Sequence, residues 1–359
     1  MPSAKTDLKS LLKDPSLLET RAYVNGQWID GDDGTFDVTN PARGDVIAQV
    51  ADLSRAQVGK AIDAAEAAQK EWASWTGKER AAVLRKWFDL MMENQDDLGT
   101  ILTAEQGKPL AEAKGEIAYG ASFIEFFGEE AKRNYGETIP GHQRDKRITV
   151  IKQFCENPKV RKLTFTGSTE VGRILLKQAS EQVMKCSMEL GGNAPFIVFD
   201  DADLDAAVEG AIMCKFRNNG QTCVCANRIY VQAGVYDAFA QKLKDRVSKM
   251  KVGDGLEAGV DLGPLINPEA GDKVIEHIKD AKSKGATVIL GDAQDTMEGN
   301  FFAPTIITGV TSEMAVATEE TFGPLAPLFK FENEDEVIAM ANDTIFGLAS
   351  YFYAKDLSR

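Results

Sequence analysis

Short apolar strands alternate with amphipathic helices along the second half of this chain, and this alternation limits the folds open to it. A strand at residues 162–166 leads into a helix that starts near Thr169. Further strands are predicted at 195–199, 228–231, 287–290, 304–307, 325–331 and 349–353. Helices are predicted between them at 204–217, 236–249, 270–284 and 334–342. Strands that alternate with helices indicate an α/β fold with a largely parallel sheet.

The first half of the chain is predominantly helical in pattern. Between residues 54 and 135, apolar residues recur at helical spacing, and a Gly-Lys-Pro break at 107–109 separates two of the helices. Residues 147–152 are rich in β-branched side chains and predict one strand.

Charge and composition restrict the partners of the chain. It has 359 residues, of which 43% are hydrophobic and 27% charged, as in an ordinary globular protein. Its net charge of -14 disfavours binding to nucleic acid or to an anionic membrane. No apolar signal core opens the sequence, and no stretch approaches the length that spans a bilayer. Five cysteines without regular spacing suit a reducing compartment, so we expect a cytoplasmic protein with a small-molecule substrate.

Histidine chemistry is restricted to two positions. His142 lies in a Pro-Gly turn and His277 in a charged helical stretch, and neither has a companion motif. A Ser-His or Cys-His hydrolase needs an imidazole beside its nucleophile. We therefore expect both histidines at the solvated surface and a carboxylate as any general base, and no metal site is expected.

A candidate thiol nucleophile lies in the sequence Asn-Gly-Gln-Thr-Cys-Val-Cys at 219–225. The turn follows the predicted helix 204–217 directly, so the main-chain N–H of Cys223 is a candidate donor to a developing oxyanion. A buried and unreactive cysteine is the alternative for an isolated thiol. Cys225 follows after one residue, and a disulfide across such a short loop would be strained and labile. A space-filling role is equally open for Cys225.

Glycine turns mark three further segments. Gly167 and Ser168 follow an apolar strand and open a helix, where unpaired N–H groups favour a phosphate, although a Ser-capped turn explains the same pattern. Arg-Ile at 173–174 replaces the Lys-Ser/Thr of a nucleotide-triphosphate loop. Glu189 precedes a glycine pair at 191–192 and could activate a water molecule. The third of these segments, at 319–324, has the sequence Glu-Glu-Thr-Phe-Gly-Pro.

Taken in this order, the motifs resemble those of the aldehyde dehydrogenase superfamily, and the flanking residues point to its succinate-semialdehyde branch. The resemblance implies that Cys223 is the nucleophile and Glu189 the general base. It also implies a Cys223–Cys225 pair, which acts as a redox switch in some members. Arg217 matches an arginine that binds the distal carboxylate of the substrate in this branch.

The same resemblance implies binding of NAD or NADP. Gly167 and Ser168 would border the pyrophosphate, and Leu190 and Gly191 would line the nicotinamide pocket. Glu320 would hold the nicotinamide ribose, with Phe322 behind the ring. The final candidate set is the following: Cys223, Glu189, Gly167, Ser168, Leu190, Gly191, Glu320, Phe322, Arg217 and Cys225.

The chain departs from the family at two places. The link between the predicted strands at 152 and 162 is too short for a crossover helix, where the family carries several βα units. The absent segment includes an oxyanion-hole asparagine, a ribose-binding lysine and the residues that decide between NAD and NADP. The end at Arg359 resembles a late part of the catalytic domain, so we also expect the family's final strands to be missing.

These comparisons predict an aldehyde dehydrogenase-like α/β fold with a partial Rossmann-type cofactor domain and an α/β catalytic domain. Residues 1–135 and 152–190 are assigned to the incomplete dinucleotide-binding domain, 136–151 to an oligomerisation strand region and 191–359 to the catalytic domain. The family function is oxidation of an aldehyde, with succinate semialdehyde as the expected substrate, and we expect impaired activity here. Two alternatives stay open: an inactive fragment that binds or assembles with relatives, and a cofactor-independent thiol esterase. The family's homo-oligomer is in doubt for this chain.

Overall fold

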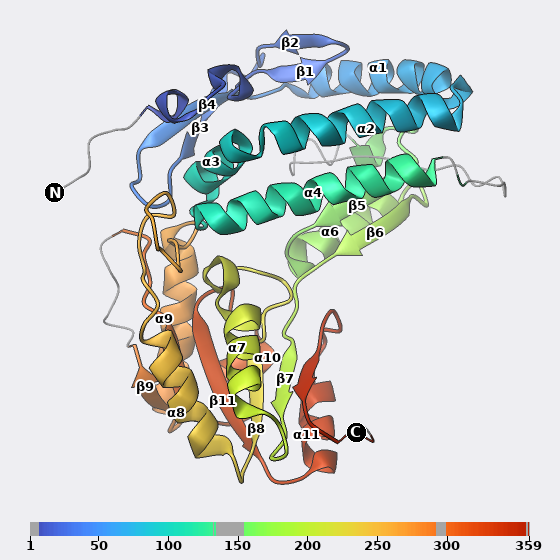
Figure 1. The fold of residues 1–359 in the computed structure, drawn as a ribbon. Helices are drawn as coiled ribbons and strands as arrows, with labels where there is room; N and C mark the ends of the chain where they lie inside the picture. Colours follow the sequence, from blue (N-terminus) through green and yellow to red (C-terminus); the bar gives the residue numbers. More distant parts are fainter. Residues whose placement is uncertain (1–6, 132, 134–153, 292–298, 357, 359) are drawn as a thin grey trace.

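The computed structural model describes residues 7–131, 133, 154–291, 299–356 and 358. The chain forms a layer of long helices, a small βαβ unit and a six-stranded sheet with helices on both faces (Figure 1). Within the described ranges, no helix is both long and apolar enough to cross a membrane. The predicted strand at 147–152, the assigned region 136–151 and His142 lie outside the described residues.

The N-terminal region begins with two 3₁₀ turns and two small hairpins that the sequence analysis did not predict. Their elements are η1 (Leu8–Leu11), η2 (Pro15–Leu17), β1 (Ala22–Val24), β2 (Gln27–Ile29), β3 (Thr35–Thr39) and β4 (Val46–Ala51). Each hairpin is antiparallel, and β1 turns into β2 through Asn25 and Gly26 at φ of 48° and 80°. The four strands are short and none of their residues is fully buried, but β4 (Val-Ile-Ala-Gln-Val-Ala) is mostly apolar and β3 (Thr-Phe-Asp-Val-Thr) alternates, so the sequence carried a signal that the prediction missed.

The predicted helical region is confirmed as four helices. These are α1 (Arg55–Ser74), α2 (Gly77–Glu93), α3 (Gln95–Gln106) and α4 (Leu110–Glu130). Ser54 and Thr76 form capping boxes at the starts of α1 and α2, which satisfy main-chain N–H groups that have no partner inside the helix. Gly107 ends α3 at φ 95°, in the left-handed conformation that favours glycine.

Two parallel strands and one helix form the βαβ unit. They are β5 (Lys162–Thr166), α6 (Thr169–Ser180) and β6 (Lys185–Glu189). The strand β6 was not predicted, although its Lys-Cys-Ser-Met-Glu sequence alternates polar and apolar residues and Cys186 and Met188 pack against a buried cluster. The register pairs Thr166 with Glu189, so the carboxyl ends of both strands lie side by side. Residues 154–156 before β5 are helical, so the short link holds a helical turn that we did not expect.

The six-stranded sheet confirms the predicted α/β pattern. Its strands are β7 (Pro195–Val198), β8 (Arg228–Gln232), β9 (Thr287–Leu290), β10 (Thr305–Val310), β11 (Leu325–Phe331) and β12 (Tyr351–Tyr353). The order is β12-β7-β8-β11-β10-β9, and every pair is parallel except that of β10 with β9.

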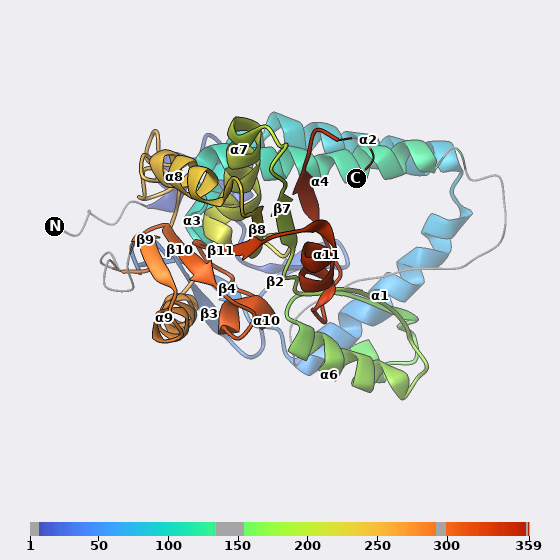
Figure 2. The same ribbon diagram turned by 90° about the horizontal axis from the view of Figure 1, so that it is seen from below.

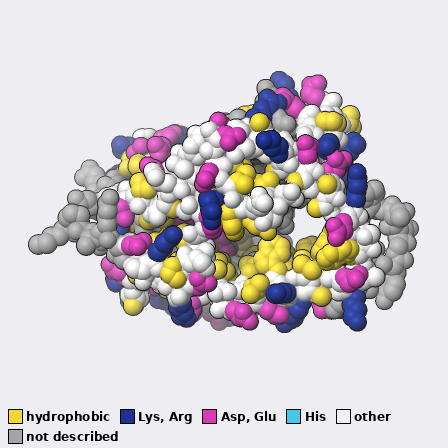
Figure 3. All heavy atoms as spheres, turned by 90° about the horizontal axis from the view of Figure 1, so that it is seen from above, with side chains coloured by type: hydrophobic (Ala, Val, Ile, Leu, Met, Phe, Trp, Pro, Cys, Tyr) yellow, Lys and Arg dark blue, Asp and Glu magenta, His cyan; other side chains and the backbone are white. Residues whose placement is uncertain are grey.

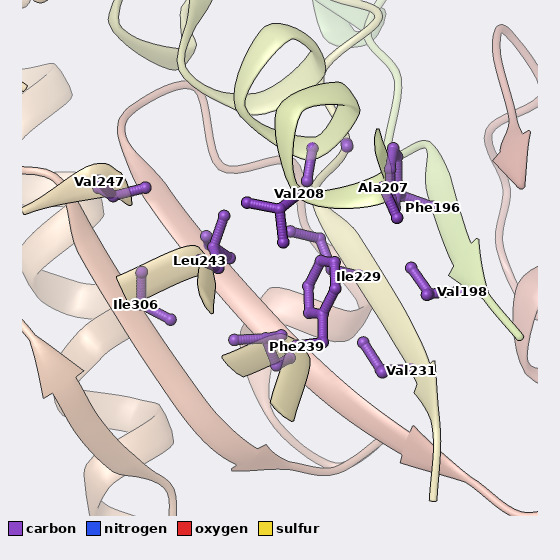
Figure 4. Packing of buried hydrophobic residues seen from close by; sticks show 14 of the residues in the cluster. Phe196, Val198, Ala207, Val208, Ile229, Val231, Phe239, Leu243, Val247 and Ile306 are labelled. Atoms are coloured by element: carbon purple, nitrogen blue, oxygen red, sulfur yellow. The ribbon is translucent and has the colours of Figure 1, made fainter. Parts of the chain in front are cut away.

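Helices cover both faces of this sheet (Figure 2). On one side lie α7 (Leu204–Lys215) and α8 (Tyr236–Val247); on the other lie α9 (Pro268–Ser283), α10 (Ala315–Thr318) and α11 (Glu334–Asn342). Successive strand residues face opposite sides, so Ile229 packs in the first core and Tyr230 in the second. Figure 4 shows Val208, Phe239 and Leu243 beside Ile229. Burial of each such aliphatic or aromatic side chain contributes about 1.5–3 kcal/mol.

The long helices of the first layer leave apolar side chains exposed. Trp87 on α2 and Phe126 on α4 expose 51% and 56% of their surface, and Tyr119 and Phe123 are also exposed. Figure 3 shows a gap that passes through the molecule, with hydrophobic side chains beside it. Amphipathic helices usually bury such a stripe against another element.

Candidate active site

The Cys223 turn follows α7 through a short irregular segment. α7 ends at Lys215, two residues before the predicted end, and η3 (Arg217–Gly220) follows. Asn218 and Asn219 have φ of 51° and 54°, in the left-handed region that asparagine tolerates. These two residues reverse the chain and carry Cys223 back towards the end of β6.

Gly192 lies between Cys223 and Glu320. Its N–H donates to Oε1 of Glu320 over 3.0 Å. A Cβ atom on Gly192 would overlap the carbonyl oxygen of Cys223, and a Cβ on Gly191 would lie 2.5 Å from Oε2 of Glu320. The tertiary structure therefore brings together three segments that are far apart in sequence: the Glu189 loop, the Cys223 turn and the Glu320 turn.

The Cys223 thiol is half-buried beside two carboxylates. Burial raises its pKa, and the charges of Glu320 and Glu189 raise it further. The main-chain N–H of Cys223 itself lowers this pKa. Both carboxylates therefore act on the same sulfur, while the adjacent N–H group offers a local donor.

Glu320 is a half-buried acid with one cationic neighbour. Burial raises its pKa, whereas the hydrogen bond from Gly192 and the charge of Lys215 lower it. Thr321 is buried next to it, and Phe322 is exposed with 43% of its surface accessible. Phe322 is thus free to contact a bound group.

The βαβ unit supplies the remaining predicted cofactor residues. Gly167 donates its N–H to the carbonyl of Glu189 over 3.0 Å, and Oγ of Ser168 accepts a hydrogen bond from Val171 N–H at the start of α6. Leu190 packs against α6 so closely that a Cβ on Gly172 would lie 2.5 Å from Leu190 Cδ2. These residues form one edge that continues into Gly191 and Glu320.

Cys225 points into the protein. Its thiol is buried, donates to the carbonyl of Gly220 at 3.2 Å and lies 3.1 Å from Oγ1 of Thr222. Both Cys223 and Cys225 are free thiols in the structure.

Arg217 is exposed and lies six residues before Cys223 in the chain. The Tyr351 hydroxyl donates to the carbonyl of Val224 over 2.9 Å, and the charges of Arg217 and Cys223 both influence the pKa of Tyr351, although burial dominates its rise. The positive charge of Arg217 also acts on Glu112, whose pKa burial raises.

The expectation that His277 is a solvated surface residue is wrong. His277 is fully buried, with Nδ1 2.8 Å from Oγ1 of Thr321 and Nε2 3.3 Å from Glu319. It lies on the buried face of α9 with Val274, Ile278 and Ala281, at spacings of three, four and seven residues. That periodicity was visible in the sequence and would have placed His277 inside.

Lys215 is a second buried polar residue that sequence reasoning did not single out. Its side chain has no accessible surface, and Nζ donates to Oδ1 of Asn227 over 2.6 Å.

Two surface grooves lie elsewhere, one along α9 and α10 and one beside α8 and β10, and neither is lined by Cys223 or Glu189.

Two segments of the chain, residues 28–153 and 146–359, match the profile of the Aldehyde dehydrogenase family. A glutarate-semialdehyde dehydrogenase of Pseudomonas putida (strain KT2440) is 53% identical, over 97% of this chain and 88% of that protein. A succinate-semialdehyde dehydrogenase of Escherichia coli (strain K12), whose name specifies NADP(+), is 50% identical with the same coverage of 97% and 88%.

Solved structures agree with these relatives. The crystal structure of an aldehyde dehydrogenase from Brucella melitensis biovar abortus 2308 has a TM-score of 0.93 and 50% identity, over 97% of this chain and 87% of that one. A succinate-semialdehyde dehydrogenase from Burkholderia pseudomallei has a TM-score of 0.92 and 47% identity, over 97% and 88%.

The comparisons also locate the predicted internal interruption. The alignments to the two bacterial relatives extend over 423 positions, whereas this chain has 359 residues, so at least 64 positions face a gap in it. The two matched segments meet at residues 146–153. The gap therefore falls between α4 and β5, at the place where the sequence predicted an interruption.

Proposed function

Since this chain belongs to the aldehyde dehydrogenase family, whose members use NAD or NADP, we propose that its site is built to oxidise a semialdehyde to its acid at Cys223. The observation that carries the proposal is the position of Gly192 between the thiol-bearing turn and Glu320. That contact brings the Cys223 turn next to Glu320, and the negative charge of Glu189 also acts on the thiol, which supports the roles proposed for these three residues.

In the proposed reaction, Sγ of Cys223 attacks the aldehyde carbon to form a thiohemiacetal, and its proton passes to a base in the site. The N–H of Cys223 donates to the developing oxyanion. Bound NAD or NADP, which Gly191, Glu320 and Phe322 would hold, would supply the hydride acceptor needed to convert the thiohemiacetal to a thioester. Glu189 then takes a proton from a water molecule, which attacks the resulting thioester and releases the acid and the Cys223 thiol.

The residues present fit part of a dinucleotide site. Gly191 has no side chain where a Cβ would press on Glu320, which leaves this carboxylate open to a ribose hydroxyl, and Phe322 is exposed beside it. Gly167 and Ser168 stand at the start of the twelve-residue helix α6, whose N-terminal N–H groups and dipole favour a phosphate. We assign 1–135 and 152–190 to an incomplete dinucleotide-binding domain and 191–359 to the catalytic domain.

A substrate with a second carboxylate fits the positive charge of Arg217, at the start of the segment that leads to Cys223. Arg217 is exposed at the Cys223 turn, and a guanidinium binds a carboxylate through two parallel hydrogen bonds. The relatives named above act, by their names, on glutarate semialdehyde and succinate semialdehyde. We infer the same class for this chain, with succinate semialdehyde as the first candidate.

We expect low activity from the 359-residue chain. By the family resemblance, the segment that faces the gap of at least 64 positions would carry an oxyanion-hole asparagine, and loss of one such donor reduces kcat by about 10²–10³-fold. The test is a titration of soluble protein with NAD and with NADP, followed by NAD(P)H formation from succinate and glutarate semialdehydes.

Cofactor binding with slow, Cys223-dependent turnover supports the proposal, and brisk turnover contradicts the expected impairment. Hydrolysis of an aryl ester that requires Cys223 and Glu189, in protein that binds no cofactor, favours the thiol esterase. Protein that does neither favours the inactive binding partner, for which the exposed apolar residues of α2 and α4 provide a surface.

A further inference from the structure

We propose that Lys215 is a positioning residue whose buried ammonium group fixes the Glu320 turn against the Cys223 turn. The consequence for cofactor binding rests on the function proposed above, but the positioning itself does not. Lys215 is the last residue of α7 and has no accessible surface.

The ammonium group connects two segments. Nζ donates to Oδ1 of Asn227 over 2.6 Å and to the carbonyl oxygen of Thr321 over 3.4 Å. Asn227 follows the Cys223 turn, and its N–H donates to the carbonyl of Cys225 over 2.8 Å. Thr321 is adjacent to Glu320. One buried cation therefore holds the thiol-bearing turn and the Glu320 turn together.

The Glu320 turn is fixed from two further directions. Oγ1 of Thr321 lies 2.8 Å from Nδ1 of His277, and Oε1 of Glu320 accepts the N–H of Gly192. A path of contacts thus runs from Lys215 through Thr321 and Glu320 to Gly192, which touches Cys223. Two groups of the proposed site, Glu320 and Cys223, are therefore connected to Lys215 by this path.

Electrostatics favours a functional role over simple space filling. Burial lowers the pKa of Lys215, and the neighbouring Cys225 and Glu320 side chains oppose this effect. For Glu320, burial raises the pKa while Lys215 lowers it. A methionine would fill the same space without the cost of a buried charge. The lysine is useful because it attracts Glu320 and donates to Thr321.

The test reads Glu320 directly in the protein without cofactor. The Gly192 amide donates to this carboxylate, so its chemical shift in protein labelled with ¹⁵N-glycine follows the ionisation of Glu320. Lys215→Met removes the cation, and we expect the midpoint of the Gly192 titration to rise by about one pH unit. Lys249→Met, at an exposed lysine two residues after the end of α8, should leave the midpoint unchanged.

A role in packing alone would change stability but not this midpoint. An unchanged Gly192 midpoint in Lys215→Met would therefore overturn the proposal. If Lys215→Met does not fold, Asn227→Leu removes one acceptor of the same ammonium group and should raise the midpoint in the same direction; no shift there overturns the proposal equally. Failure of NAD(P) to bind would reject the proposed function and leave this result intact.

The groups that bear on this titration are few in the described part of the chain. Lys215 and the Gly192 N–H act on Glu320, and Glu320 acts in turn on the Cys223 thiol. The Gly192 titration in a Cys223→Ser variant separates the thiol's contribution. It should retain the dependence on Lys215 because the lysine reaches Glu320 through Thr321.

Discussion

Gly192 donates its N–H to Oε1 of Glu320 over 3.0 Å, although the two residues are 128 positions apart in the sequence. The same glycine has no room for a side chain, because the carbonyl of Cys223 occupies the position of its missing Cβ. One residue without a side chain therefore sets the distance between two segments of the proposed site. The predictions below begin with this contact.

Gly192→Ala should disrupt the site. The obstacle is main chain rather than the end of a flexible side chain, so the Cys223 turn must move. We expect a destabilisation of about 1–3 kcal/mol, typical of overpacking, together with altered alkylation of Cys223. Urea unfolding and mass-spectrometric mapping of iodoacetamide adducts measure both effects.

Gly115→Ala is the matched control. Gly115 lies inside α4, and a Cβ there meets nothing within 4 Å. Replacement of an interior helical glycine by alanine should stabilise the protein by about 0.5–1 kcal/mol. If Gly192→Ala is as well tolerated as Gly115→Ala, the close approach to Cys223 is not present in solution.

The reactivity of Cys223 should increase when a neighbouring carboxylate is neutralised. Burial and the negative charges of Glu320 and Glu189 raise the pKa of the thiol, which keeps it protonated at neutral pH. Glu320→Gln removes one of these charges, so the pKa falls and a larger fraction is thiolate. The iodoacetamide rate at Cys223, measured across pH, should show its midpoint at lower pH.

Lys215→Met is a second variant for the same measurement, because it changes the charge state of Glu320 and keeps its carboxyl group. Loss of the lysine's positive charge raises the pKa of Glu320, so Glu320 does not stay permanently ionised in this variant. A Cys223 midpoint that is the same in Glu320→Gln and in the parent protein would show that Glu320 does not act on the thiol.

Stability should fall with acid because of His277. Burial lowers the pKa of this imidazole in the folded state, whereas the unfolded chain binds the proton with the ordinary value of 6.5. The unfolded state therefore binds more protons below that value, and stability is lost as the pH falls through it, by at most about 1.4 kcal/mol per pH unit.

His277→Gln should flatten this slope while lowering the overall stability. Charges around the ring modify the effect: Lys273 lowers the pKa, and Glu319 and Glu276 raise it. Glu319 has a lowered pKa through Lys273 and His277, so its own contribution is lost only at more acidic pH, below its ordinary 4.5. Urea unfolding between about pH 7.5 and about pH 5.5 isolates the histidine; an identical slope in the variant would contradict the assignment.

Mild peroxide should join Cys223 to Cys225 and stop turnover or thiol reactivity reversibly. The step removes one hydrogen from each thiol and consumes one peroxide, with two molecules of water as products. A bridge across one intervening residue is strained, so a dithiol should reduce it readily. Intact-mass measurement should find a loss of two hydrogen atoms that Cys225→Ser abolishes. Two free thiols after treatment would reject the switch.

Because Cys225 is buried, formation of the disulfide requires a conformational change. Its thiol points to the carbonyl of Gly220 and to Thr222, so the residues of the turn must move before the sulfurs can bond. We therefore expect the bridge to form more slowly than alkylation of Cys223.

The local patterns in the sequence were sufficient for the sheet and the motifs. Apolar runs predicted β7, β8 and β11, and the Ser-Thr sequence at 168–169 predicted the start of α6, because these features depend on neighbours in the chain. The hairpins at 22–51 and β6 were not predicted, although β3 and β6 alternate polar and apolar residues and β4 is mostly apolar. These strands are short and partly exposed, so the local signal is weak and pairing with the partner strand adds to it.

The sequence by itself determined the α/β class, the motif order and the family, because local propensity and the spacing of motifs can be read from the chain without coordinates. Only the tertiary structure decided that Gly192 separates Cys223 from Glu320, that His277 is buried, and that Lys215 joins the two turns inside the protein. Those contacts join residues that lie far apart in the chain, and only the packing of α7 and α9 on the sheet brings them within hydrogen-bonding distance.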